Sequence, residues 1–267
     1  MDYQITFPGG VRRAVTFSYD DGTVYDRRLI EIFNKYNLKA TFHLNSGKFG
    51  LMHSDGEYIK EDEVLSLYSG HEVSAHGYTH QYYSDLTPNQ MLSELLSDKR
   101  ALERLCRYPV RGMSYPFGES FDELVKVAEV IGLEYSRTVN STFNFNLPTD
   151  FMHWNPTCHH NDAMSLLPDF INAPDWRGLC LFYVWGHSFE FEKENTWDKM
   201  EEFCKKTGAL DNVWFATNIE IKDYLCAARG IISDADGKTL YNPSAVTVYI
   251  KYDGTILNIN PGQMLRL

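Results

Sequence analysis

Strand-like and helical segments alternate along most of the chain, and this alternation limits the folds that the sequence can adopt. Strands are predicted at residues 11–19, 39–45, 71–76, 111–115, 134–139, 178–185 and 213–217. Helices are predicted at residues 26–37, 61–68, 89–107, 121–131, 197–206 and 220–228. About seven strand–helix units predict a wound α/β fold or an α/β barrel. Residues 140–175 interrupt this order and are predicted to be rich in loops.

The C-terminal part of the chain has a different pattern. Asp-Gly pairs at 236–237 and 253–254 separate short alternating segments, which is typical of β-hairpins. We therefore expect two parts: residues 1–230 as an α/β catalytic domain, and residues 231–267 as a small antiparallel β extension packed on it.

Composition excludes several classes of protein. The 267 residues are 43% hydrophobic, which is ample for a core, and the net charge of -11 argues against a nucleic-acid partner. No stretch has the uncharged length needed to span a membrane. The N-terminal residues MDYQITFPGG show no signal-peptide pattern, and the five cysteines form no CxxC pair. These features predict a cytoplasmic protein and leave its oligomeric state open.

Residues that can carry chemistry follow the predicted strands, where parallel α/β folds place their sites. Asp20 and Asp21 end the first strand. They could be ordinary turn or cap residues, or one carboxylate could bind a metal while the other moves protons. His76 and His80 follow the third strand, and two imidazoles four residues apart can bind one metal if the segment forms a helical turn.

Two further predicted strands contain or lead into residues that could take part in catalysis. Arg111 begins a segment that runs into the turn Pro116-Phe117-Gly118, whose backbone N–H groups could bind an oxyanion. Arg111 could orient a carboxylate, or it could be a surface arginine. His187 ends the apolar strand LCLFYVWGH and could be a general acid or base, or a histidine at the edge of a sheet.

Several aromatic and histidine side chains are candidates for a substrate pocket. The aromatic candidates could stack on a sugar, although each could equally belong to the core; they are Tyr78, Trp154 and Trp185. The cluster Cys158-His159-His160 resembles a second metal site, but residues so tightly bunched rarely bind one ion. We therefore expect His159 or His160 to line the pocket.

Taken together, the segments TFSYDDG, GHEVSAHGYTH, RGMSYPFG and LFYVWGHS resemble the motifs of the polysaccharide deacetylase superfamily, the carbohydrate esterases of family four. The resemblance covers roughly residues 12–220. It implies a distorted (β/α) barrel with fewer than eight units, in agreement with the strand count. It also implies that Asp20 is the catalytic base and that Asp21, His76 and His80 bind the metal.

By the same resemblance, Arg111 would steady Asp20, the Phe117 N–H would lie in the oxyanion hole, and His187 would be the general acid. Three departures from the family pattern stand out. Ser18-Tyr19 precedes the aspartates, Phe117 stands where tyrosine is common, and no clear equivalent of the family's fourth motif is found.

The expected activity is metal-dependent hydrolysis of a carbon–nitrogen amide or an ester, which removes acetyl groups from an N- or O-acetylated carbohydrate. Zinc is the expected ion, and cobalt, nickel or iron would suit the same ligands. The alternative is a related cytosolic amidohydrolase that acts on a small amide such as a cyclic ureide. A carbohydrate-binding relative without activity is the third reading, and it is disfavoured because every expected catalytic position is filled.

Overall fold

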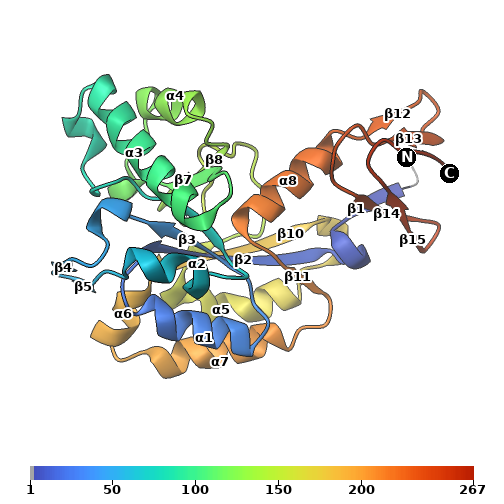
Figure 1. The fold of residues 1–267 in the computed structure, drawn as a ribbon. Coiled ribbons are helices and arrows are strands. Elements are labelled where there is room, and N and C mark those ends of the chain that lie inside the picture. Colours follow the sequence, from blue (N-terminus) through green and yellow to red (C-terminus); the bar gives the residue numbers. More distant parts are fainter. Residues whose placement is uncertain (1–2) are drawn as a thin grey trace.

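The computed structural model describes residues 3–267, and its central feature is a curled parallel sheet of eight strands (Figure 1). Seven strands follow the order β8-β7-β6-β3-β2-β10-β9, and β11 pairs with the first half of β2. Their bounds are β2 (Arg13–Asp21), β3 (Ala40–Leu44), β6 (Glu72–Ala75), β7 (Gly112–Ser114), β8 (Tyr135–Arg137), β9 (Cys158–His159), β10 (Cys180–His187) and β11 (Val213–Phe215).

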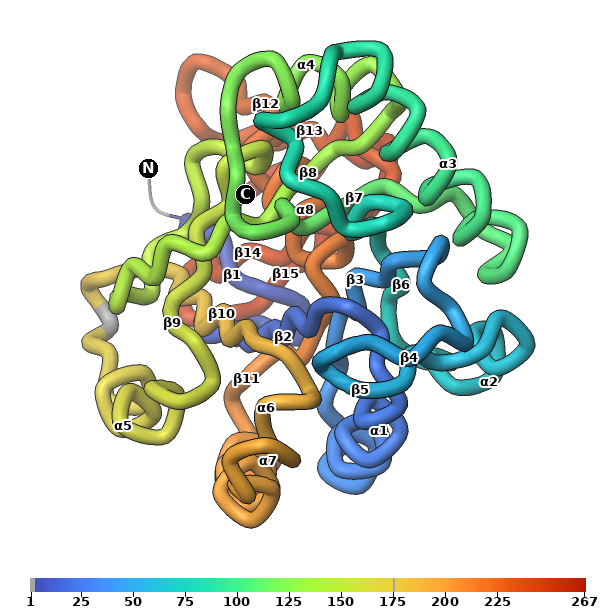
Figure 2. The backbone as a smooth tube through the Cα atoms, turned by 90° about the vertical axis from the view of Figure 1, so that its left-hand side faces the viewer, coloured from blue at the N-terminus to red at the C-terminus, as the bar shows by residue number. Residues whose placement is uncertain are grey.

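Helices cover the outside of this sheet, and the strands curve around a common interior (Figure 2). The helices are α1 (Asp26–Lys35), α2 (Val64–Leu67), α3 (Pro88–Cys106), α4 (Asp122–Val130), α5 (His160–Ile171), α6 (Ser188–Lys193), α7 (Trp197–Gly208) and α8 (Asn218–Arg229). Among residues 3–267, no helix combines the length and the apolar character that a membrane span needs. The predicted distorted α/β barrel is confirmed as an open half-barrel.

The predicted strand β2 is the centre of this architecture. Its residues from Ala14 to Asp21 are all buried, as expected of a parallel strand covered on both faces. Its first half pairs with β11 and its second half with β3, while β10 runs along its other edge. Because β10 keeps register with β2 to the end, His187 lies opposite Asp20.

The stretch of residues 140–175 is more regular than predicted. It contains β9 and the twelve-residue helix α5, which was missed because Pro168 lies inside it. Proline removes one helical hydrogen bond and is usually read as a helix end. Helix α6, which directly follows β10, was also not predicted.

The C-terminal β appendage is confirmed, and it includes the N-terminal strand. Strand β1 (Tyr3–Thr6) pairs antiparallel with β14 (Val248–Tyr252), which forms a hairpin with β15 (Thr255–Ile259). A second small sheet contains β12 (Ile232–Ser233), β13 (Thr239–Tyr241) and β16 (Met264–Arg266). The hydroxyl of Tyr224 on α8 donates to the Thr6 carbonyl and accepts from the Tyr249 N–H, which joins both termini to the barrel. A short hairpin, β4 (Met52–His53) and β5 (Gly56–Glu57), completes the strands.

One buried carboxyl group makes the stability of the fold depend on pH. Glu72, at the start of β6, accepts hydrogen bonds from the hydroxyls of Thr41 and Tyr135 and from the Ile219 N–H. Burial nevertheless raises the pKa of Glu72 from 4.5 to about 7, because desolvation of the charge outweighs these bonds. The folded state therefore binds this proton more tightly than the unfolded chain does.

We predict that Glu72→Gln removes part of the pH dependence of unfolding. The stabilising protonated form is fully present below pH 4.5 and is lost as pH rises through about 7. Between pH 4.5 and 8 the native chain should lose roughly 3 kcal/mol relative to Glu72→Gln. Urea unfolding across this range measures the difference. The control Glu123→Gln changes an exposed carboxyl on α4 and should follow the native curve, and a native-like curve for Glu72→Gln would contradict the prediction.

Candidate active site

The two adjacent carboxylates at the end of β2 face the same region because the backbone turns between them. Consecutive strand residues normally point to opposite faces. Asp21 instead has a φ of 80°, and Gly22 follows with a φ of 79°. A left-handed conformation is strained for a residue with a side chain and is often found at functional sites. Both carboxylates are almost completely buried.

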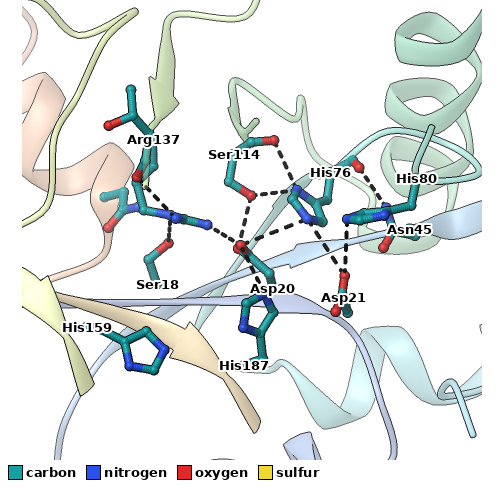
Figure 3. A network of polar contacts seen from close by, with 12 residues as sticks. Ser18, Asp20, Asp21, Asn45, His76, His80, Ser114, Arg137, His159 and His187 are labelled. Atoms are coloured by element: carbon teal, nitrogen blue, oxygen red, sulfur yellow. Dashed lines mark hydrogen bonds and ion pairs between the residues drawn. The ribbon is translucent and has the colours of Figure 1, made fainter. Parts of the chain in front are cut away.

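Asp21, His76 and His80 form a group that could bind a metal ion, and their ligand atoms all lie within 4.8 Å of one another (Figure 3). Oδ1 of Asp21 lies 3.7 Å from Nε2 of His76 and 3.7 Å from Nε2 of His80. Within residues 3–267 this buried oxygen has no hydrogen-bond partner. Ligands about 2.1 Å from a tetrahedral ion lie about 3.4 Å apart, so the group fits a divalent cation such as zinc.

The two imidazoles meet through a loop and not through the helical turn that their spacing suggested. The segment after β6 is irregular, with Gly77 at a φ of 79° and His80 at 59°. Nδ1 of His76 donates to the Ser114 carbonyl oxygen at 3.0 Å, which leaves the lone pair of Nε2 free to face Asp21. Such a bond fixes the tautomer of a metal-binding histidine.

Asp20 is held by an arginine from the far edge of the sheet. Arg137, which ends β8, donates to Oδ2 of Asp20 and to the hydroxyl of Ser18, and it is fully buried (Figure 3). The Ser114 hydroxyl donates to Oδ1 at 2.9 Å. Burial alone would raise the pKa of Asp20, but the charge of Arg137 and the nearby imidazoles hold it well below its usual value. Asp20 is therefore ionised at neutral pH.

The prediction that Arg111 steadies Asp20 is wrong. Arg111 forms ion pairs with Glu134 at 2.5 Å and with Asp223 at 2.7 Å. It precedes β7, so it lies at the N-terminal end of a strand, away from the catalytic edge. Arg137 lies inside the strand predicted at residues 134–139, but the observed strand β8 ends at Arg137. With the correct strand end, the rule that strand ends carry the chemistry would have found it.

Nε2 of His187 lies 4.0 Å from Oδ2 of Asp20 (Figure 3). Its Nδ1 lies 3.3 Å from Oε1 of Glu190 on α6. Burial would lower the pKa of His187, but Glu190 and the two aspartates raise it to about 9. Glu190 is not among the predicted site residues because helix α6 was not predicted.

Phe117 belongs to the 3₁₀ turn Pro116–Gly118 and has a φ of 55°. Its ring lies flat on that of Tyr82 with 3.7 Å between ring centroids, and its edge contacts His80. Phe117 is 47% exposed and Tyr82 51% exposed, so the two rings form an open aromatic surface beside the metal ligands. Tyr78 is also exposed, and its backbone carbonyl accepts from the Gly47 N–H.

The remaining pocket candidates lie in different parts of the structure. Trp185 lies beneath the Arg137 guanidinium, 4.5 Å from it, and contacts His159 edge-on. Trp154 is only 1% exposed and packs against Tyr135 and Tyr183, so it belongs to the core. A cavity of about 430 Å³ lies beside Trp154, but no proposed metal ligand lines it. His159 and His160 form a cluster of their own with Glu190.

Comparison with known proteins agrees with this geometry. Residues 9–136 match the family model of the polysaccharide deacetylases. This part of the chain, just under half of it, is therefore similar to the polysaccharide deacetylases. The match includes Asp20, Asp21, His76 and His80 but ends just before Arg137 and well before His187. The placing of the last two residues therefore depends on the structure.

Individual relatives of this chain are distant. YxkH of Bacillus subtilis (strain 168), assigned to the polysaccharide deacetylases, is 26% identical over 128 residues, which are 47% of this chain and 44% of YxkH. The chain thus matches less than half the length of this curated relative. A crystal structure assigned to the same class from Mycobacterium smegmatis has a TM-score of 0.62 at 19% identity, covering 85% of this chain and 94% of that one. A family 4 acetyl xylan esterase from Clostridium thermocellum, with a cobalt ion, has a TM-score of 0.54 at 14% identity and covers 78% and 90%.

We predict that the two arginines differ in their effect on stability. Arg137→Gln should lower the free energy of unfolding by about 3–5 kcal/mol, because it leaves the Asp20 carboxylate buried without its partner. Arg111→Gln breaks partly exposed ion pairs and should cost about 1 kcal/mol. Urea unfolding measures both. Arg137→Lys keeps the charge and should lose less than Arg137→Gln, and equal losses for the two glutamine variants would contradict the assignment.

Proposed function

We propose that the protein is a metal-dependent hydrolase that removes acetyl groups from an N- or O-acetylated carbohydrate. The observation that carries this proposal is the buried, ionised Asp20 between two different groups. Its Oδ2 lies 3.8 Å from Nε2 of His76, which forms the proposed ligand group with Asp21 and His80, and 4.0 Å from Nε2 of His187. The similarity of residues 9–136 to the polysaccharide deacetylases supports the same reaction class.

The three ligands would hold a divalent cation, and zinc suits two imidazoles and a carboxylate. When bound, the cation supplies a Lewis acid that polarises an acyl carbonyl and acidifies water. The protein's contribution is to present three ligand atoms on a fixed frame. His76 is oriented by Ser114, and Asp21 is fixed by the end of β2.

Asp20 is the base that removes a proton from the attacking water. Each of its oxygens accepts one hydrogen bond, from Ser114 and from Arg137, and a carboxylate has further lone pairs to receive the proton. The same two bonds fix its direction. Arg137 keeps Asp20 ionised, so the base is ready in its active form before substrate binds.

His187 donates a proton to the departing amine or alcohol. Its Nδ1 side faces Glu190, and its Nε2 side faces Asp20 and the reaction region. In the site without an ion, Glu190 and the two aspartates raise the pKa of His187, which favours the imidazolium form. Base and acid therefore lie side by side with opposite charges, as the two proton transfers of amide or ester hydrolysis require.

The substrate side of the site suits a sugar. The backbone N–H of Phe117 is the proposed hydrogen-bond donor to the developing oxyanion. A contact of this type is worth about 3–4 kcal/mol. The exposed rings of Phe117 and Tyr82 form a flat apolar surface next to His80. Such rings bind the apolar face of a pyranose while its hydroxyls stay in water.

We predict that Asp20→Asn lowers the rate of acetate release from acetylated xylan and N-acetylglucosamine oligomers by about 10²–10⁴-fold. Asparagine keeps the shape of the side chain but cannot accept the proton. The variant should still bind zinc, which dialysis followed by elemental analysis would show. The matched variant Asp21→Asn should lose the zinc as well as the activity.

Two outcomes would reject parts of this assignment. Native rates of acetate release by zinc-loaded Asp20→Asn would show that Asp20 is not the base. Ammonia release or ring opening from cyclic ureides, without acetate from any acetylated sugar, would assign the site to small amides instead.

We predict that Tyr82→Ala and Phe117→Ala weaken sugar binding more than catalysis. Loss of one stacking ring should raise KM for acetylated oligosaccharides by about 2–10-fold. Turnover of a small acetyl ester should stay near the native value, since alanine at position 117 keeps the backbone N–H. Steady-state kinetics with both substrates measure this. An equal loss of activity with both substrates would mean that the two rings support the structure of the site and do not bind the sugar.

A further inference from the structure

A second group of metal-binding side chains lies on the other side of β10. His159 ends β9, His160 begins α5, and Glu190 lies on α6. One ligand atom from each lies within 4.8 Å of the others. We propose that these three residues bind a second divalent cation of the zinc class, separate from the ion at Asp21, His76 and His80.

The distances within this cluster are close to those of a tetrahedral site. Oε2 of Glu190 lies 3.4 Å from Nε2 of His160, and without an ion it accepts a hydrogen bond of 3.0 Å from Nε2 of His159. Ligands about 2.0–2.2 Å from a tetrahedral ion are separated by about 3.3–3.6 Å. Two imidazoles and one carboxylate are also an established ligand set for zinc and similar metals. The fourth position would be open to water.

His160 is the observation that most needs a ligand. Its side chain is 1% exposed, and within the described part of the chain neither ring nitrogen makes a hydrogen bond. A buried polar group without a partner costs free energy, so buried histidines normally have one. Nε2 faces Glu190 at 3.4 Å, in the direction where an ion would complete its bonding.

The neighbouring residues hold the His160 ring in this position. It stacks on Tyr19 and contacts Phe191 with 4.2 Å between ring centroids. Gly186 makes room for it, because a Cβ at that position would lie 2.0 Å from Nδ1 of His160. A glycine in the middle of a buried strand weakens the strand, and here it admits the imidazole.

The cluster is open to solvent on one side. The side chains of His159 and Glu190 are 21% and 23% exposed, so an ion can reach them from water. Nδ1 of His159 accepts a long hydrogen bond from the Asn161 N–H, at 3.4 Å. Metal binding through Nε2 moves the ring proton to Nδ1 and releases this weak bond.

Glu190 contacts both the cluster and His187. Oε2 faces the two histidines of the cluster and accepts a hydrogen bond from the backbone N–H of His187 at 3.2 Å, and Oε1 faces Nδ1 of His187. An ion on Oε2 would fix the carboxylate and so the orientation of His187. The second ion would therefore connect β9, α5 and α6 and act as a positioning element for the proposed general acid.

The test is the number of zinc ions bound per chain, with zinc chloride as the only ligand. Equilibrium dialysis and elemental analysis should give two ions for the native chain. His159→Ala, His160→Phe and Glu190→Gln should each bind one, while His80→Ala, which breaks the first group, should also bind one. His153→Ala is the matched control, because it removes a partly exposed histidine that pairs with Asp150, and it should keep two ions.

Circular dichroism establishes that each variant is folded, and His159→Ala provides the test if the buried His160→Phe does not fold. Anomalous diffraction at the zinc edge should place the second ion between the two imidazoles and Glu190. One ion in the native chain overturns the proposal. So do two ions in His159→Ala or Glu190→Gln, or a second anomalous peak elsewhere.

Discussion

The site depends on one buried ion pair, that of Arg137 with Asp20. Two adjacent carboxylates at the end of a buried strand repel each other, and at least one would take up a proton without a compensating charge. Arg137 supplies that charge from β8, at the edge of the sheet, although β7, β6 and β3 lie between β8 and β2 in the strand order. It can reach Asp20 because the sheet curls. The ion pair in turn links the end of β8 to the end of β2.

The ion pair also separates the roles of the two aspartates. Each oxygen of Asp20 accepts one hydrogen bond, from Ser114 or from Arg137, whereas Oδ1 of Asp21 faces two imidazoles. The positive φ at Asp21 makes this division possible, because it turns the second carboxylate toward the loop after β6. Two residues with the same side chain thus have different electrostatic surroundings within one peptide unit.

Most of the barrel and part of the site could be predicted because both follow from local patterns. Buried strands are continuous apolar runs, and side chains at their C-terminal ends converge, so Asp20, Asp21 and His187 were found. Contacts between distant segments could not be predicted. Arg111 begins one predicted strand and Arg137 lies within another, and only the observed end of β8 and the curl of the sheet decide which of them reaches the carboxylate.

The other omissions have local causes. Glu190 was missed because α6 is a six-residue helix that begins directly after a strand, with no loop to mark the change. Helix α5 was missed because its proline argues against a helix, although the surrounding burial compensates for the lost hydrogen bond. His76 and His80 were predicted to meet, but for an incorrect reason. Their spacing suggested a helical turn, whereas an irregular loop with positive φ angles at Gly77 and His80 brings the two imidazoles together.

The pairing of β1 with β14 has a consequence for how the protein is made. Residues 3–6 have their sheet partners at 249–252, so almost the whole chain separates the two halves of this ladder. Closing so long a loop is entropically unfavourable, and contacts of this kind form late in folding. During synthesis, strand β1 therefore stays unpaired until residues 248–252 have left the ribosome. The appendage would be the last part of the fold to assemble, and its closure would join the two ends of the finished barrel.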